Sequence, residues 1–210
     1  MLDVVIDLSH HNTLTETSFL EAARAGIVGC LHKVTEGTWY LDGTYTERQV
    51  WALEAGVWWG AYHFGRSGDP VGQAHYFLEQ VQPTPDTLLV LDWETCPSDV
   101  SMSRAEAEVF VHAVAAETGR YPGLYSGMSF CGDAMGGCED TVLSQCWLWL
   151  ARYSETPPEV PPVWPTWSMW QYTQEGRVPG IAGPCDRDRF HGDLDGLRRL
   201  WGVAPAEGTR

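Results

Sequence analysis

Short runs of apolar residues recur along the chain, and stretches with helical spacing separate most of them. Apolar runs bounded by Gly, Pro or Asp predict buried strands. Seven segments fit this description: Val4–Leu8, Val28–Lys33, Trp58–Phe64, Leu88–Trp93, Gly123–Tyr125, Trp147–Ala151 and Met169–Tyr172. Helical spacing of apolar positions predicts helices over Thr17–Ala25, Tyr45–Ala55, Pro70–Gln80 and Ser103–Thr118. The alternation of the two predicts an α/β fold.

The ends of the predicted helices carry recognisable signals. Ser101 or Ser103 can cap the last of them. Gly26 and Gly56 each follow an Ala at a predicted helix end and suit left-handed C-caps. The Pro-rich stretch 156–167 cannot hold a long helix. We therefore expect a barrel of strands whose later repeats have lost some of their helices.

With 210 residues, the chain is long enough for one domain with a full core and short for two. We expect this domain to occupy residues 1–203, followed by a frayed tail over residues 204–210. Hydrophobic residues make up 44% of the chain and charged residues 20%, which favours a globular protein over a disordered one.

The chain is strongly acidic, with a formal net charge of −15. Its sequence contains no run rich in Lys and Arg, so nucleic acid is not an expected partner and anionic surfaces would repel the protein. An anionic wall polymer would therefore have to be held by a shaped groove. Eleven Trp and eight Tyr residues could supply faces for stacking on sugar rings, although we expect most of them in the core.

The N-terminal segment Met1–Asp7 carries acids where a secretory signal needs basic residues and a long apolar stretch, so we expect no Sec-type signal. No apolar run approaches the ~18 to 20 residues of a membrane-spanning helix. These patterns predict synthesis in the cytoplasm and no membrane insertion. A target in the cell wall or periplasm would then require export by a holin or a secretion system.

The six cysteines contain no Cys-x-x-Cys pair, which argues against a structural zinc site. A protein without a signal peptide first meets a reducing cytosol, so we expect mostly free thiols. The cluster of Cys131, Cys138 and Cys146 is where a disulfide is most readily formed later. Cys30 lies in an apolar run, and we expect it to be an inert core residue.

Two carboxylates, Asp92 and Glu94, lie two residues apart at the end of the apolar run Leu88–Leu91. Strand residues two apart face the same side, so both should point into the cavity on which the strand opens, while Trp93 packs on the other side. In a parallel barrel, catalytic groups gather at the C-terminal ends of the strands. Acids after a strand also cap helices or pair with Arg, and the spacing alone does not separate these roles.

Two further acids have comparable positions. Asp7 ends the first apolar run, and Asp186 follows the segment Gly180–Cys185, where the barrel would close beside the first strand. Taken singly, each is more often a turn or cap residue. Four acids at corresponding strand ends are harder to explain in this way, because gathering unpaired negative charge costs stability unless a function needs it.

A series of motifs extends over nearly the whole chain. In order, they are Ile6-Asp7-Leu8-Ser9, Lys33-Val34-Thr35-Glu36-Gly37, Tyr40 with Asp42, Ala55-Gly56, Gly60-Ala61-Tyr62-His63-Phe64, Leu91-Asp92-Trp93-Glu94, Leu124-Tyr125-Ser126, Leu148-Trp149-Leu150-Ala151-Arg152-Tyr153, Trp170-Gln171-Tyr172, Val178-Pro179-Gly180-Ile181 and Phe190-His191-Gly192. Each motif is weak alone, but their order and spacing make a specific signal. On these motifs the chain resembles the glycoside hydrolase family 25 lysozymes, the Chalaropsis-type muramidases.

The resemblance implies an irregular (β/α)8-like barrel and hydrolysis of the β-1,4 bond between N-acetylmuramic acid and N-acetylglucosamine in peptidoglycan glycan strands. We also expect a monomer without a cofactor, and a carboxylate cluster of this kind needs no metal. Glu94 matches the general acid of the family, Asp92 the adjacent carboxylate, and Asp7 and Asp186 the two further acids. The positions in matched segments that we expect to bind substrate are Tyr62, Lys33, Tyr125, Gln171, Phe64 and Trp149.

The residue types suit this chemistry. Cleavage of a glycosidic bond needs a protonated carboxyl at the leaving oxygen and negative charge beside an oxocarbenium-like centre. Crowded acids raise one another's pKa, so one can stay protonated while another is ionised. At the C1 centre a carboxylate can attack directly, or the N-acetyl group of the substrate can attack while a carboxylate orients it. The resemblance favours the second route, with Asp92 as the orienting group and retention of configuration.

Two other classes of function remain open at the level of sequence. Asp7, Asp92, His10, His11 and His63 could hold a divalent metal, as in a metal-dependent sugar deacetylase. A non-catalytic wall-binding module would keep the groove without turnover, but such a module usually lacks a carboxylate, and here all four are present. The biological setting is open too, between a phage endolysin and a bacterial effector delivered by a secretion machine.

Overall fold

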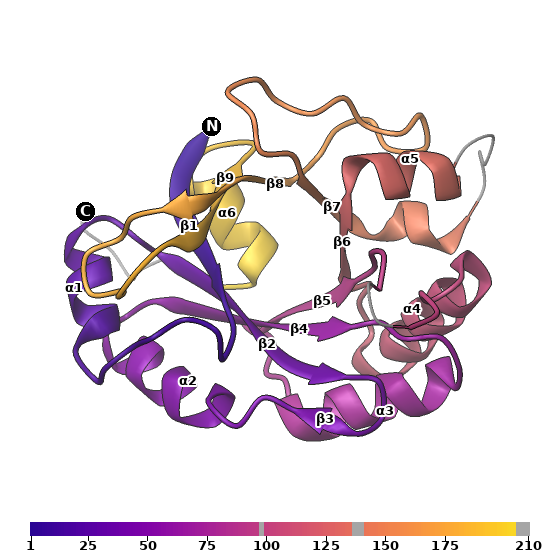
Figure 1. Cartoon of the computed structure of the whole chain (residues 1–210), viewed down its shortest axis with the longest axis horizontal. Coiled ribbons are helices and arrows are strands. Elements are labelled where there is room, and N and C mark those ends of the chain that lie inside the picture. The colour runs from indigo at the N-terminus through magenta and orange to yellow at the C-terminus, as the bar shows by residue number, and fades with distance from the viewer. Residues whose placement is uncertain (97–98, 136–140, 205–210) are drawn as a thin grey trace.

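The computed structural model describes residues 1–96, 99–135 and 141–204. Its strands are β1 (Leu2–Leu8), β2 (Gly29–Glu36), β3 (Tyr40–Leu41), β4 (Trp58–Phe64), β5 (Leu88–Asp92), β6 (Gly123–Gly127), β7 (Trp147–Ala151), β8 (Met169–Gly176) and β9 (Cys185–Phe190). Eight strands of the described chain close into a barrel in the order β1-β9-β8-β7-β6-β5-β4-β2, because β2 also pairs with β1 (Figure 1). The short strand β3 forms a hairpin with the C-terminal end of β2. The predicted α/β barrel is thus confirmed.

The helices of the described residues are α1 (Ser18–Arg24), α2 (Tyr45–Glu54), α3 (Pro70–Val81), α4 (Arg104–Thr118), α5 (Met128–Met135) and α6 (Leu194–Trp201), with a 3-10 turn at Val142–Gln145. The first four match the predicted helices to within one residue at each end. Ser103 caps α4 through a capping box with Glu106. Gly26 and Gly56 have φ values of 100° and 75°, so both are the left-handed residues expected after α1 and α2.

The second half of the barrel has a different outer cover. Helices α1 to α5 lie outside the strands (Figure 1). Between β7 and β8, the Pro-rich stretch 156–167 is irregular and buries Trp164 and Trp167 against the barrel. The Trp164 indole donates a hydrogen bond of 3.0 Å to the Cys146 carbonyl, which holds this stretch in place. The expected loss of helices from the later repeats is therefore confirmed.

Strand β9 was not among the predicted strands, and it runs antiparallel to both of its neighbours. Its sequence alternates acids with arginines from Asp186 to Arg189, so it lacks the apolar run by which the other barrel strands were identified. The two arginines face outward, where the Arg189 guanidinium lies 4.0 Å from the centre of the Tyr172 ring and Arg187 pairs with Asp3. The arginines of β9 thus have partners on the outer face of the strand, and the acids of β9 point into the barrel.

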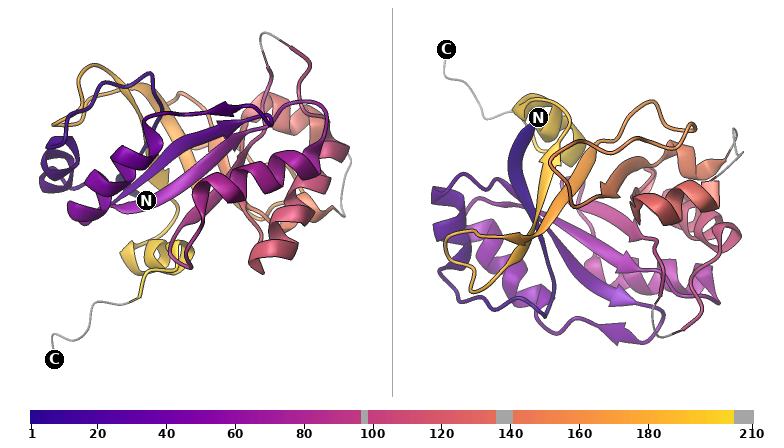
Figure 2. Two further views of the ribbon diagram at one scale, coloured as in Figure 1. Left: turned by 90° about the horizontal axis from the view of Figure 1, so that it is seen from below. Right: turned by 45° about the horizontal axis from the view of Figure 1, so that its top comes forward.

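The barrel interior is apolar at the end where β1 begins. Val5, Leu31, Leu88 and Met169 form a cluster there with Leu197 and Trp201 of α6. Helix α6 lies against this end of the barrel (Figure 2), and the Trp201 indole donates to the Trp59 carbonyl at 2.9 Å. Helix α6 therefore covers this end of the barrel, and the other end, where the parallel strands end, is left for a ligand.

Four cysteines of the described chain, Cys30, Cys131, Cys146 and Cys185, are buried free thiols. Burial raises the pKa of Cys131 and Cys146 to about 12 and that of Cys185 to about 11, which makes them poor nucleophiles. Cys138, the third member of the predicted cluster, lies outside the described residues, as do residues 205–210 of the predicted tail. None of the helices that the structure describes is long and apolar enough to cross a membrane.

Candidate active site

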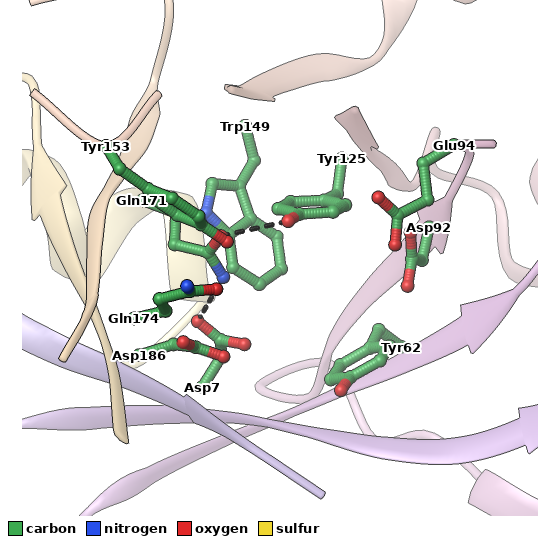
Figure 3. A pocket seen from close by; sticks show the side chains of 10 residues that line it. All are labelled: Asp7, Tyr62, Asp92, Glu94, Tyr125, Trp149, Tyr153, Gln171, Gln174 and Asp186. Carbon is green, nitrogen blue, oxygen red and sulfur yellow. Dashed lines mark hydrogen bonds between the residues drawn. The ribbon is translucent and has the colours of Figure 1, made fainter. Parts of the chain in front are cut away.

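A pocket opens at the C-terminal ends of the parallel strands (Figure 3). Its lining consists of Asp7, Tyr62, Asp92, Glu94, Tyr125, Trp149, Tyr153, Gln171, Gln174 and Asp186. All four predicted carboxylates therefore face one cavity, although they come from three strands that lie far apart in the sequence. Asp186 reaches this end of the barrel from the start of an antiparallel strand, where it pairs with Asp7 across the ladder.

The structure places six predicted substrate-binding residues at this end of the barrel. Tyr62, Tyr125, Trp149 and Gln171 line the pocket itself. Lys33 and Phe64 lie beside it: the Lys33 ammonium is 5.0 Å from the centre of the Phe64 ring. This ammonium also forms a 2.7 Å ion pair with Glu36, so its charge is already partnered.

Asp92 and Glu94 form one side of the pocket (Figure 3). Asp92 is the last residue of β5 and pairs in register with Phe64 on β4 and Tyr125 on β6, which fixes its position. Between the two acids, Trp93 turns the other way and is fully buried. The strand alternation predicted for this segment is therefore present, and it directs both carboxylates into the cavity.

Burial controls the protonation of this pair. It raises the pKa of Asp92 well above the usual range, and the charge of Glu94 raises it further. Burial also raises the pKa of Glu94, while the nearby Lys33 ammonium lowers the pKa of both acids. The pair therefore keeps a proton at pH values where isolated carboxyls are ionised, and the more deeply buried Asp92 holds it in the empty pocket.

One oxygen of Asp92 can accept a hydrogen bond from a ligand. Oδ1 is buried and has no hydrogen-bond partner among the described residues. A buried polar atom without a partner is costly, because its hydration is lost and nothing replaces it. Since Asp92 lines the pocket, a substrate with a donor group at this point would supply the missing hydrogen bond.

The opposite wall is held by Gln171. Its side-chain amide donates to Asp7 Oδ2 at 2.9 Å, and its carbonyl oxygen accepts hydrogen bonds from Tyr125 at 2.9 Å and Tyr153 at 3.2 Å (Figure 3). Burial raises the pKa of Tyr153 to about 12, so its hydroxyl remains a donor at neutral pH. These bonds fix the Gln171 amide and both tyrosines, which makes the wall rigid before substrate binds.

Asp188 is a buried acid that the sequence reasoning missed. It lies on β9 two residues after Asp186, is completely buried, and accepts a 2.7 Å hydrogen bond from the Trp149 indole. Its Oδ2 has no hydrogen-bond partner from a fixed donor among the described residues, the Asp7 carboxyl lies next to Asp188, and burial raises the pKa of both acids well above the usual range. Two carboxyls can hydrogen-bond only by sharing a proton, and the Asp188 charge raises the pKa of Asp7 so that Asp7 donates. The two-residue spacing that paired Asp92 with Glu94 would also have identified Asp188.

Replacing Asp188 by Asn is expected to stabilise the fold at neutral pH. The Asn side chain can still accept from Trp149 and can donate to Asp7, whereas the buried charge disappears. Because Asp7 and Asp188 have folded-state pKa values above their unfolded values, the contribution of this pair to wild-type stability falls as the pH rises above about 4. Thermal unfolding should therefore show similar Tm values near pH 4 or below and a Tm higher by about 2 °C or more for the variant at pH 7. An unchanged or lower Tm at pH 7 would contradict the assigned proton sharing.

Two other pocket residues were also absent from the predicted set. Tyr153 lies just after β7 and belongs to one of the matched motifs, so that motif was the signal available for it. Gln174 lies on β8 beyond Tyr172, where the strand was expected to end. The strand continues to Gly176, and this extension places Gln174 in the pocket lining.

The histidines of the metal hypothesis are not gathered in the pocket. His63 lies on the outer face of β4, where it is buried and hydrogen-bonds with Thr35 and Gln73. His10 lies 3.3 Å from the Asp42 carboxylate. The described part of the chain contains no group of three or more His, Cys, Asp or Glu side chains arranged to hold a metal ion. The histidines and acids that the deacetylase alternative needs as metal ligands therefore lie apart in the structure.

Comparison with known proteins agrees with this site. Residues 6–181 match the sequence pattern of the Glycosyl hydrolases family 25. Lysozyme M1 of Streptomyces globisporus is 32% identical over 208 residues, which cover 93% of this chain and 70% of that protein. A lysozyme of Streptococcus phage Cp-9 is 31% identical over 155 residues, which cover 72% of this chain and 44% of the phage protein, so this chain spans less than half of its length. The crystal structure of the bacterial lysozyme from Streptomyces coelicolor matches with a TM-score of 0.85 and 31% identity, covering 97% of this chain and 98% of that one. The chain therefore belongs to glycosyl hydrolase family 25, which its motifs resemble, and is a glycoside hydrolase.

Proposed function

We propose that the protein is a lysozyme that cleaves the β-1,4 bond between N-acetylmuramic acid and N-acetylglucosamine in the glycan strands of bacterial peptidoglycan. The observation that carries the proposal is the placement of Glu94 beside the buried, partnerless Oδ1 of Asp92 in one pocket. One carboxyl can give a proton to the leaving oxygen, and the other can accept a hydrogen bond from the substrate. Relatives that are named lysozymes support the substrate class.

In the first step, Glu94 protonates the glycosidic oxygen. The bond from this oxygen to C1 of the muramic acid breaks, and the N-acetylglucosamine side leaves as an alcohol. The carbonyl oxygen of the N-acetyl group on the same muramic acid forms a new bond to C1 from the opposite face. Asp92 accepts a hydrogen bond from the N–H of that acetamido group. This bond makes the carbonyl oxygen more nucleophilic and stabilises the positive charge of the cyclic oxazolinium product.

In the second step, the Glu94 carboxylate takes a proton from water, and the water oxygen bonds to C1. The bond from C1 to the acetyl oxygen breaks, which restores the N-acetyl group and returns Glu94 to its protonated form. Two inversions at C1 leave the β configuration unchanged. Direct attack by Asp92 on C1 in the first step, in place of the acetyl oxygen, is the alternative route, and it would also retain the configuration.

Substrate binding itself can move the proton that Asp92 and Glu94 share onto Glu94. In the empty pocket, burial favours the proton on Asp92. A hydrogen bond from the substrate N–H favours the ionised form of Asp92, because hydrogen bonds to a carboxylate lower its pKa. The shared proton then moves to Glu94, where the leaving oxygen needs it. On the opposite wall, Asp186 and the Asp7–Asp188 pair, which carries one negative charge when it shares one proton, are proposed to act electrostatically near the positive C1 centre.

Product analysis tests the bond that is cleaved. Digestion of purified peptidoglycan is expected to release muropeptides with N-acetylmuramic acid at the new reducing end, so that borohydride reduction followed by mass analysis gives muramitol. Reduced glucosamine at the chain end, or freed peptide amines, would refute the proposal. The same digestion in EDTA should proceed at an unchanged rate, whereas a metal-dependent deacetylase would lose activity. A wall-binding module would release no reducing sugar.

We also propose that residues 1–203 form one monomeric catalytic domain that acts on the cell wall after export. The phage lysozyme among its relatives supports an endolysin that depends on a holin. An effector delivered by a bacterial secretion machine is the alternative. A holin gene next to the coding gene would favour the first setting, and an immunity gene would favour the second.

A further inference from the structure

Trp39 is the only tryptophan among the large hydrophobic side chains that the described residues expose, with 64% of its surface accessible. It lies in the turn between β2 and β3, at the end of the barrel where the pocket opens. Tryptophan is a mostly buried residue, because its large ring gains much from leaving water. An exposed ring beside a substrate pocket therefore requires a specific explanation.

One face of the Trp39 ring is fixed by the protein. Gly37 has a φ of 55°, and a Cβ at this position would overlap the Trp39 ring, so only glycine lets the ring lie against the turn. The Arg66 guanidinium lies 5.8 Å from the ring centre, within the range of a cation–π contact. The ring is thus held against the protein on one side, and its high exposure leaves the other side to solvent.

Arg66 is itself held in place. Its side chain is 11% exposed, and it lies 3.5 Å from the Glu36 carboxylate and 3.4 Å from the Asp99 carboxylate. It also contacts the Cys96 sulfur. Because Arg66 has two acidic partners, its positive charge next to Trp39 is neutralised. A rigid apolar ring on this support can bind a flat apolar face with little loss of side-chain entropy.

Contacts from Trp39 to Lys33, and the charge of Lys33, connect Trp39 with the candidate acid. Glu36 connects Arg66 to the Lys33 ammonium at 2.7 Å, and the Lys33 charge acts on Asp92 and Glu94. The strand register agrees, because Glu36 on β2 pairs with Phe64 on β4, which pairs with Asp92 on β5. Two strand spacings correspond to about 10 Å. Trp39, three residues after Glu36, therefore lies at the same end of the barrel as the two acids, beyond a strand that is two positions away from β5.

We propose that Trp39 is a stacking platform for a sugar ring of the bound glycan strand, away from the bond that is cleaved. This inference rests on the proposed function, since it assigns a further binding position for the same polymer. The open ring face suits the apolar face of a pyranose, and the neutralised Arg66 gives no preference for the acidic stem peptide. The platform would hold long strands in register with Asp92 and Glu94.

Steady-state kinetics of Trp39→Ala and Trp39→Phe on two substrates tests the proposal. On long glycan strands freed of stem peptides, we expect Trp39→Ala to raise KM by about 3- to 10-fold with little change in kcat, the scale of one aromatic contact. Trp39→Phe should recover most of this loss. On the shortest oligosaccharide that the enzyme cleaves, both variants should match the wild type. Tyr121→Ala is the matched control, because Tyr121 is an exposed aromatic residue just before β6, at the opposite end of the barrel. This variant should have the wild-type KM and kcat on both substrates.

The outcomes separate this inference from the proposed function. A wild type that releases no muramitol from peptidoglycan refutes the lysozyme assignment. A wild type that does so, with Trp39→Ala equal to it on long strands, refutes only the platform. Equal losses on long and short substrates would refute it as well, because they would indicate a disturbed pocket. If free stem peptide competes with binding and the loss appears only on strands that carry peptides, the partner of Trp39 is peptide and the sugar assignment is wrong.

Discussion

Replacing Glu94 by Gln is expected to lower the rate of peptidoglycan cleavage by about 100- to 10,000-fold, the usual contribution of general acid catalysis. The amide has nearly the shape of the carboxyl but cannot donate the proton that the leaving oxygen needs. Substrate binding should persist, because the groove and the Asp92 acceptor are unchanged. Release of reducing sugar measures the first effect, and cosedimentation with insoluble peptidoglycan measures the second.

Glu117→Gln is the control for this experiment. It makes the same chemical change at a half-exposed position near the end of α4, on a residue that does not line the pocket. Its activity and Tm should equal those of the wild type. If Glu94→Gln kept wild-type turnover, Glu94 would have no part in the mechanism. If it lost turnover together with several degrees of Tm, the loss would instead reflect a damaged fold.

The parts of the fold that the sequence predicted are those with local signals. Strands such as β4 and β7 are apolar runs ended by turn residues, and α4 has its own capping box, so neither depends on distant contacts for recognition. Strand β9 lacks such a signal because charged residues occupy both of its faces. Its inward positions carry Asp186 and Asp188, and its arginines pack outside the barrel. Local rules fail most readily at functional sites, and β9 is one of them.

The candidate site, too, could be predicted only where the sequence carries a local signal. The two-residue spacing of Asp92 and Glu94 predicted a shared face, and the motifs indicated which distant strands would meet. Proton positions follow from burial and from neighbours that only the closed barrel creates. The contact between Asp7 and Asp188 depends on β9 lying beside β1 in a particular register. Likewise, the ion pair of Lys33 with Glu36 depends on the irregularity of β2 between Lys33 and Thr35. Neither of these two interactions can be predicted from the spacing of the residues along the chain.

Replacing Asp92 by Asn is expected to reduce activity nearly as much as the Glu94 variant, for a different reason. The carboxylate that accepts the substrate N–H would become an amide, which can still accept a hydrogen bond but carries no negative charge for the positive transition state. Loss of one preorganised electrostatic contact typically costs about 100- to 1,000-fold in kcat. KM should change little, because the hydrogen bond in the ground state can be retained. Steady-state kinetics on soluble glycan strands would separate the two constants.

The pH profile of the Asp92→Asn variant distinguishes this role from simple positioning. In the wild type, activity needs one proton in the pair, so it should fall at low pH, where both acids are protonated, and at high pH, where both are ionised. Because burial raises the pKa of both acids, the active range should lie above that of isolated carboxyls. Without Asp92, only Glu94 has to be protonated, so the residual activity should lose its acidic limb and fall only as the pH rises through the pKa of Glu94. A variant whose residual activity kept the bell-shaped profile would show that the acidic limb comes from another group, such as the Asp7 and Asp188 pair on the opposite wall.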